Sequence, residues 1–236
     1  MAGETVKTEG IVLQIRPWSR TSHVVTWLTP DHGPVATLVK GAVRPKSAFL
    51  GQYDLFYTCE ILYYARASGD LHPLREVTPR ETRDHLRGRW RETSLAGYAA
   101  DLVRELAPAN DESLEWFAFL SRLLDDLAAE TPPFRTRWRA LIRLEMGILT
   151  RAGLAPDFSA MDASAEWTPF AVDLGRCGEG PRTTRLTPRT VAALRGAPNG
   201  DEEGAVRFLG VFLAYHLERP AGIRRSLVSL LGGAPR

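Results

Sequence analysis

Cysteine is scarce in this sequence, and its scarcity excludes two kinds of structure. Only Cys59 and Cys177 occur in 236 residues, and neither stands in a C-x-x-C pair. Two distant cysteines cannot build a disulfide framework, and they supply too few thiolates for a Cys-based zinc site. We therefore expect two reduced thiols, no metal and no other cofactor.

Long apolar runs and a strong net charge are also missing. No stretch approaches the roughly 18 apolar residues of a membrane span, and the opening MAGETVKTEG does not resemble a signal peptide, which predicts a cytoplasmic protein. The formal net charge is only +2, from 30 Lys and Arg against 28 Asp and Glu. Most of these cations are Arg, which suits phosphate contacts, but a GC-biased genome gives the same skew. Any anion site must come from local clustering.

The composition is that of an ordinary globular protein, and the first third of the sequence is typical of strands. Residues 7–79 alternate runs rich in Val, Ile, Leu, Thr and aromatics with breaks such as TPDHGP and ASGD, which predicts five strands in a small barrel. A hairpin is expected at PDHG, where Gly33 supplies a permissive backbone. Apolar residues on both faces between Tyr53 and Tyr63 predict one long central strand there.

Beyond residue 80 the hydrophobic period becomes that of a helix. Three helices are predicted within TRDHLRGRWRETSLAGYAADLVRELAP, DESLEWFAFLSRLLDDLAAE and PPFRTRWRALIRLEMGILTRAG, with Asp111 as an N-cap and Gly153 as a stop. Residues 155–186 show turn formers and little periodicity, and three more helical stretches follow. The fold class predicted is therefore α+β. Its domains are a five-stranded barrel at 1–80, a helical bundle at 81–154 and 187–236, and an irregular insert at 155–186.

The segment KGAVRPKS, residues 40–47, gathers positive charge around a glycine and a proline. It does not match the P-loop pattern, because Pro45 stands where a glycine precedes the lysine and the spacing is one residue short. Lys40, Arg44 and Lys46 are better suited to contact successive phosphates of a nucleic acid backbone. The alternative is an ordinary solvated loop.

A second candidate is IRPWSR, residues 15–20, at the end of the first predicted strand. Arg16 and Arg20 flank Trp18, and stacking of a base on such a ring is worth about 1–3 kcal/mol. Cations beside an aromatic are typical of single-strand binding, so Arg16, Trp18 and Arg20 join the predicted nucleic-acid site. Ordinary packing of Trp18 is the alternative.

Catalysis has little support. The histidines form no HxH or HxxxH pair, and neither Ser47 nor Ser68 has a base suggested nearby in sequence. The adjacent Asp125 and Asp126 point to different sides of a predicted helix. We expect a protein that is not an enzyme; a metal-independent nuclease or phosphoesterase is the alternative.

Five stretches in order resemble the RecO family of bacterial recombination mediators and DNA-repair proteins. They are KTEGIVL, TPDHGPVATLVKGAVRPKS, LYYARASGDLHPLRE, LAGYAADLVREL and LIRLEMGILTRAGLAPDF. The resemblance covers residues 7 to 158 and, more weakly, 187 to 231. It implies an N-terminal OB-fold, in which strands two and three and their flanking loops commonly hold oligonucleotide, followed by a helical domain.

The resemblance also implies partners. Members of the family bind single- and double-stranded DNA, anneal complementary strands and associate with RecR. They engage the C-terminal tail of the single-stranded-DNA-binding protein and help to load RecA. An interaction scaffold whose barrel binds protein instead of DNA is the alternative.

The insert departs from the family pattern. Many relatives carry two C-x-x-C pairs of a zinc ribbon after the position of GLAPDF, whereas this chain has only Cys177 there. The remaining candidates would make an oxygen-rich site that suits zinc poorly, namely Asp157, Asp162, Asp173 and Glu179. We expect the hairpin of the insert to depend on packing alone.

An acidic partner tail with an apolar end would fit an apolar pocket rimmed by Arg. The stretch FRTRWRALIRLEMGIL offers the apolar residues Phe134, Trp138, Leu141 and Ile142, with Arg135, Arg139 and Arg143 along their margins. Its predicted partner-binding residues are Phe134, Arg135, Trp138, Arg139 and Arg143. The alternative is an amphipathic core helix with a solvated Arg edge.

Overall fold

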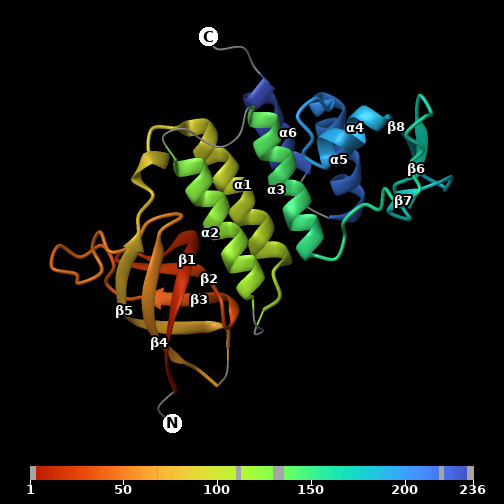
Figure 1. Ribbon diagram of the computed structural model, residues 1–236. Coiled ribbons are helices and arrows are strands. Elements are labelled where there is room, and N and C mark those ends of the chain that lie inside the picture. Colours follow the sequence, from red (N-terminus) through yellow and green to blue (C-terminus); the bar gives the residue numbers. More distant parts are fainter. Residues whose placement is uncertain (1–3, 68, 110–112, 130–135, 218–220, 233–236) are drawn as a thin grey trace. The chain divides into compact units, whose positions relative to one another are not determined.

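The computed structural model describes residues 4–67, 69–109, 113–129, 136–217 and 221–232. The chain forms two compact units, residues 1–131 and 132–236, which are described in turn below (Figure 1). The domain boundaries drawn from the sequence stay a prediction. No helix within the described ranges is long and apolar enough to cross a membrane.

The first unit begins with a closed five-stranded barrel, as the sequence predicted. Its strands are β1 (Glu4–Ser19), β2 (Ser22–Thr29), β3 (Gly33–Val39), β4 (Thr58–Ala65) and β5 (Leu71–Glu81). They close in the order β1-β2-β3-β5-β4, with β3 and β5 parallel and the other pairs antiparallel. This is the topology of an OB-fold, so the α+β prediction is confirmed.

Trp27 fills the barrel interior, and the residues around it bond to its indole and leave space for it. Its side chain is fully buried, and its indole N–H donates to Thr37 Oγ1 at 2.8 Å. Gly10 lies against it: a Cβ there would come within 3.1 Å of Trp27 Cβ and 3.3 Å of Ile61 Cδ1. The glycine of KTEGIVL therefore makes room for the tryptophan.

The β2–β3 turn confirms the predicted hairpin and shows why glycine is required. Gly33 has a φ of +64°, and a Cβ there would lie 2.1 Å from the carbonyl oxygen of Pro108. The backbone N–H of Ser113 also donates to Pro30 O at 2.7 Å. The turn is thus pinned against the connection between the first two helices.

The predicted long strand from Tyr53 to Tyr63 is wrong in its first half. β4 begins at Thr58, because Phe56 adopts a left-handed φ of 68° and turns the chain. Phe56 N–H and Tyr57 O instead exchange hydrogen bonds with Val12 at 3.0 and 2.9 Å. The apolar alternation of residues 53–57 therefore belongs to a loop whose side chains still pack on the barrel.

The helices of the first unit follow a single 3-10 turn at Asp84–Leu86. They are α1 (Trp90–Leu106) and α2 (Leu114–Ala128). The predicted N-cap Asp111 lies outside the described residues, and Ser113 occupies the N-cap position of α2.

Arg83 joins the barrel to α2. Its guanidinium is buried and donates to Phe56 O at 2.8 Å, Thr58 Oγ1 at 2.8 Å, Asp125 Oδ1 at 2.7 Å and Ser121 Oγ at 3.0 Å. Two acceptors lie at the start of β4 and two on α2. One side chain therefore holds two elements together.

The second unit contains helices and a small sheet. Its elements are α3 (Arg137–Arg151), β6 (Thr168–Ala171), β7 (Arg176–Cys177), β8 (Thr183–Leu186), α4 (Pro188–Leu194), α5 (Glu202–His216) and α6 (Ala221–Gly232). The three predicted C-terminal helices are confirmed. Gly153, with a φ of +70°, follows the end of α3 as predicted.

The insert is more ordered than the sequence indicated. Residues 168–186 form an antiparallel sheet in the order β7-β6-β8, whose strands have only two to four residues. Strands this short give no readable period. Phe170 of β6 is fully buried and packs on Phe158, Phe208 and Phe212, with ring centroids 5.7, 5.1 and 6.2 Å away.

A buried ion pair connects three helices of this unit. Arg224 of α6 donates to both carboxylate oxygens of Glu145 on α3, at 2.6 and 2.9 Å, and to Val206 O on α5 at 2.8 Å. A Cβ at Gly210 would lie 2.7 Å from Arg224 Nη1. Glycine at this position therefore leaves the space that the Arg224 guanidinium occupies.

Replacing Arg83 tests the link between barrel and helix. Arg83→Met keeps the apolar stem but leaves buried acceptors unpaired, so we expect the free energy of unfolding to fall by about 2–3 kcal/mol in urea denaturation. The control is Arg80→Met, which removes an exposed ion pair to Glu60 and should cost under about 1 kcal/mol. Equal losses in the two variants would contradict the role assigned to Arg83.

Candidate nucleic-acid interface

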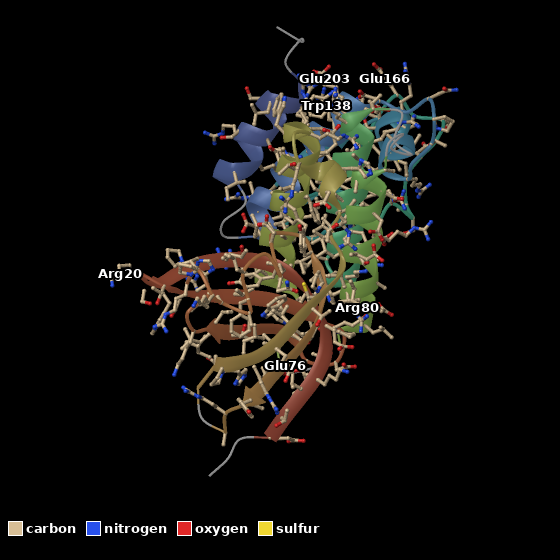
Figure 2. All side chains as sticks on the ribbon, turned by 90° about the vertical axis from the view of Figure 1, so that its left-hand side faces the viewer. Arg20, Glu76, Arg80, Trp138, Glu166 and Glu203 are labelled. Atoms are coloured by element: carbon tan, nitrogen blue, oxygen red, sulfur yellow. The ribbon has the colours of Figure 1, made fainter. Side chains whose placement is uncertain are left out.

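The β1–β2 turn and the β3–β4 loop lie side by side at one end of the barrel. Ser19 pairs with Ser22 across the turn. The N–H groups of Gly41 and Val43 donate to Ser22 Oγ at 3.2 Å and Thr21 O at 3.3 Å. Two sequence segments that each carried predicted DNA-binding residues therefore meet. We call residues 15–23 and 40–57 together the cationic end; Figure 2 shows Arg20 projecting from it at the edge of the barrel.

The cations of this end are exposed and lack acidic partners. Among the described residues, no Asp or Glu forms an ion pair with any of them: Arg16, Arg20, Lys40, Arg44 and Lys46. Elsewhere on the barrel surface, Lys7 and Arg80 both pair with Glu60, and Arg75 pairs with Glu76. The positive charge at the cationic end is left uncompensated, as an anion site requires.

Two consecutive turns shape the loop that carries three of these cations. Arg44 N–H donates to Gly41 O at 3.1 Å, and Ser47 N–H donates to Arg44 O at 2.9 Å. Gly41 has a φ of +68°, and a Cβ there would meet the stem of Arg44 at 3.2 Å. Gly41 is therefore needed for the left-handed backbone of the first turn. In a P-loop, by contrast, glycines let backbone N–H groups surround a phosphate.

Trp18 is an exposed ring beside these cations. It is 62% exposed, whereas Trp27 in the same barrel is fully buried. Packing inside the barrel, the alternative considered for Trp18, is therefore wrong. The stacking role of Trp18 stays a prediction.

A hollow of about 440 Å³ opens within the cationic end, and no sequence pattern predicted it. Ile15, Val43, Phe49 and Leu50 are among its lining residues. It exists because the chain turns at residues 53–57, where the sequence predicted a strand.

The predicted partner-binding stretch on α3 divides among different environments. Phe134 and Arg135 lie outside the described residues. Leu141 and Ile142 are buried in the core, so they do not line a surface pocket. Arg143 is exposed, while Trp138 lines a groove of about 680 Å³ with Val206, Arg207 and Val228.

Arg139 is already engaged within the protein. Its Nε–H donates to Glu202 Oε1 at 2.5 Å, and its Nη2 donates to Ala197 O at 3.2 Å. This joins the start of α3 to the start of α5. To accept a partner carboxylate, Arg139 would have to give up the pair with Glu202, so the binding role predicted for it has no support from this geometry.

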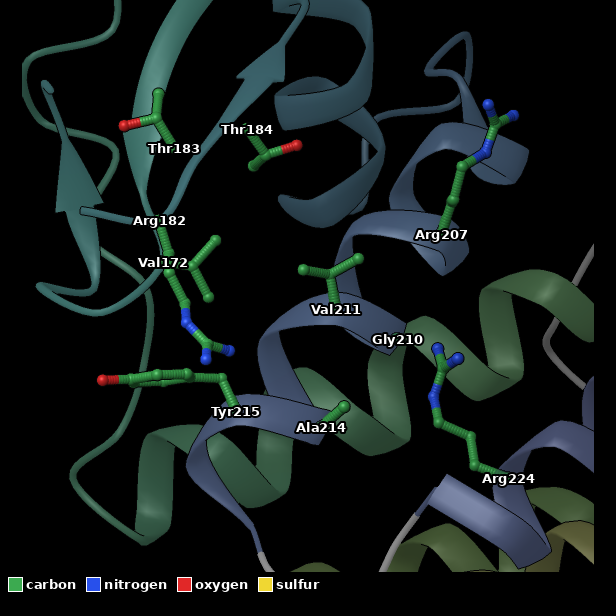
Figure 3. A pocket seen from close by; sticks show the side chains of 10 residues that line it. All are labelled: Val172, Arg182, Thr183, Thr184, Arg207, Gly210, Val211, Ala214, Tyr215 and Arg224. Atoms are coloured by element: carbon green, nitrogen blue, oxygen red, sulfur yellow. The ribbon is translucent and has the colours of Figure 1, made fainter. Parts of the chain in front are cut away.

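A different groove in the second unit combines apolar and cationic groups. Its volume is about 660 Å³, and Figure 3 shows Val172, Val211 and Ala214 lining it together with several Arg side chains. The Arg182 guanidinium lies over the ring of Tyr215, 5.1 Å from its centroid. Sequence reasoning missed this groove because Arg182 and Tyr215 come from separate elements that only the fold brings together.

Two of the candidate zinc ligands, Asp157 and Asp162, accept hydrogen bonds from neighbouring residues. Ser159 N–H donates to Asp157 Oδ1 at 2.8 Å, which lowers the pKa of that carboxyl. Ser164 donates to Asp162 Oδ1 from its hydroxyl at 2.6 Å and from its backbone N–H at 2.8 Å, and these hydrogen bonds lower the pKa of Asp162. Burial raises the pKa of the Cys177 thiol. Within the described ranges, no group of three or more His, Cys, Asp or Glu could hold a metal.

Comparison with known proteins gives a consistent match along the chain. A family model described as "Recombination protein O N terminal" matches residues 1–83, and one described as "Recombination protein O C terminal" matches residues 87–225. "DNA repair protein RecO" of Anaeromyxobacter sp. (strain K) is 32% identical, over 95% of this chain and 96% of the relative. The protein of the same name from Xanthomonas oryzae pv. oryzae (strain PXO99A) is 35% identical over 63% of this chain and 59% of its own.

Metal analysis tests the interpretation of the insert. Protein purified without chelator should contain clearly less than one zinc per chain, and added chelator should leave the melting temperature unchanged, because a structural zinc site contributes folding energy. Stoichiometric zinc, or a melting temperature that falls with chelator, would contradict this expectation.

Proposed function

Because the chain belongs to the RecO family of DNA repair proteins, we propose that it is a recombination mediator whose barrel binds DNA at the cationic end. The observation that carries this proposal is the cluster of five exposed cations without acidic partners among the described residues, beside an exposed Trp18. Elsewhere on the barrel, Lys7, Arg75 and Arg80 are paired with carboxylates. A surface that leaves its positive charge free is suited to a polyanion.

The proposed contact is mainly with the DNA backbone. Lys40, Arg44 and Lys46 would neutralise phosphates and release counterions, which gives affinity without reading sequence. Trp18 would add stacking that tolerates any base but requires an unpaired one. The site would thus accept both single and double strands and favour single strands.

The more specific roles that the family resemblance implies are compatible with a protein that binds a DNA strand through its phosphate backbone. We propose that it anneals complementary strands and, with RecR and the single-stranded-DNA-binding protein, helps to load RecA on DNA in the nucleoid. The protein would act by binding, without catalytic turnover. Prolonged incubation with DNA should therefore yield no cleaved product.

We also propose that the groove of Figure 3 receives the acidic tail of the single-stranded-DNA-binding protein. Its lining residues include three Arg and no Asp or Glu, whereas the groove beside Trp138 includes Glu203. Arg207 pairs with Glu203 and Arg224 with Glu145, so Arg182 is the cation that the groove offers to a ligand. Arg182 forms no ion pair with a described residue. Val211 and Tyr215, both exposed, provide apolar surface for the end of the tail.

Removing the loop cations tests DNA binding. Lys40→Ala, Arg44→Ala and Lys46→Ala together should weaken binding of single-stranded DNA uniformly across sequences and lower the salt slope by roughly 0.7 per lost contact. Affinity is measured by fluorescence anisotropy between 50 and 200 mM salt. The matched control replaces three paired cations, Lys7, Arg75 and Arg80, with Ala. If the loop variant keeps the wild-type slope, the loop is not part of the site.

Salt dependence also separates the mediator from the alternative scaffold. Charge-driven DNA binding should weaken steeply over the same salt range. A barrel that binds protein through an apolar surface would show no such dependence and no measurable DNA affinity.

Charge reversal tests the tail groove. Arg182→Glu should weaken binding of an acidic peptide with an apolar C-terminal residue at least about tenfold while sparing DNA affinity. Arg185→Glu, three residues further along the chain on β8 and outside the groove, is the control. Arg143→Glu examines the α3 site predicted from the sequence. Loss in Arg143→Glu alone would place the tail at α3.

A further inference from the structure

We propose that the hollow within the cationic end is a pocket for one unpaired base of the bound single strand. This inference rests on the proposed DNA binding and adds to it a site that distinguishes single strands from duplex. The pocket lies between the barrel wall and the β3–β4 loop, and Trp18 is not among its lining residues.

The size and lining of the pocket suit a flat, partly apolar ligand. Its volume of about 440 Å³ is within the usual range for small-molecule sites. Ile15, Ala42 and Phe49 contribute apolar surface from β1 and the loop. Val43, Leu50 and Leu55 line it while remaining substantially exposed, with Leu50 at 56%. Apolar groups gathered at one exposed place mark a binding site.

Polar groups in the pocket match the edge of a base. His23 and Tyr53 line it, and His23 Nδ1 lies 2.8 Å from Tyr53 OH. Tyr53 also packs edge-on against Trp27, with ring centroids 6.1 Å apart, which fixes its orientation. His23 Nε2 has no hydrogen-bond partner among the described residues. It is available to a donor or acceptor on a base.

The charges around the pocket identify the occupant as nucleic acid. Arg44 directly follows the lining residue Val43, and Lys46 lies in the same loop before the lining residue Phe49, so unpaired cations adjoin the pocket where phosphates next to the base would lie. Asp54, the acid in the lining, is paired with Arg87 at 2.9 Å. A protein segment with a purely apolar face would gain nothing from these cations.

The geometry predicts a preference for single strands. A base in a duplex is stacked and paired, and extruding it costs a few kcal/mol. An unpaired base can enter freely. The pocket therefore adds affinity for single strands alone, beyond the backbone contacts that both forms share.

The experiment combines pocket variants with strands that lack bases. Leu50→Ser and Leu55→Ser, made singly, change exposed side chains and should leave the fold intact. Each should weaken binding of an oligothymidine strand about tenfold, within the range of one stacked base. Neither should change binding of the same strand with abasic sites throughout, or of duplex DNA. Tyr53→Phe, which keeps the ring but removes the hydroxyl, should show the same selectivity to a smaller degree.

The controls separate this proposal from the proposed function. Leu114→Ser changes an exposed leucine in the same unit, outside the pocket, and should bind every probe as wild type does. Wild-type affinity for the abasic strand and its salt slope report the phosphate contacts alone. If the pocket variants bind oligothymidine normally, or lose equal affinity for the abasic strand, the base pocket is refuted while backbone binding stands. If the wild type shows no salt-dependent binding to any strand, the proposed function itself fails.

Discussion

The guanidinium of Arg83 is the contact on which the first unit depends. It satisfies acceptors at the start of β4 and on α2, and it does so from a left-handed backbone position that places the side chain inward. By donating to Phe56 O and Thr58 Oγ1, it holds the point at which the β3–β4 loop ends and β4 begins. The loop that carries Lys40, Arg44 and Lys46 is thus anchored at its far end. A buried charge with this many partners specifies geometry more than it adds stability.

The surface of the barrel distributes its charge unevenly. Away from the cationic end, Lys7 and Arg80 lie against Glu60, and Arg75 lies against Glu76. At the cationic end the neighbours are Trp18, Val43 and Leu50, all exposed. A chain of net charge +2 can therefore offer a strongly positive local surface.

The sequence predicted the barrel, the hairpin at Gly33 and the helices, because alternation, turn residues and helical periods are local signals. It failed where tertiary contacts override them: at Phe56, whose left-handed backbone ends a false strand, and in the short strands around Phe170. The residues that we predict to bind DNA were chosen from clustered charge, and the fold brings the two clusters together. The hollow between barrel and loop, and the groove at Arg182, join residues from separate elements and had no local signal.

Gly210, Arg224 and Glu145 constrain how the second unit can evolve. A side chain at Gly210 would collide with the guanidinium, and loss of either charged partner would leave the other buried and alone. A single substitution at any of the three should therefore destabilise the unit, whereas joint replacement of all three by well-packed apolar residues could preserve its stability. Homologues should keep or lose these three residues as a set. Such covariation would reflect the packing of helices and not a role in binding DNA.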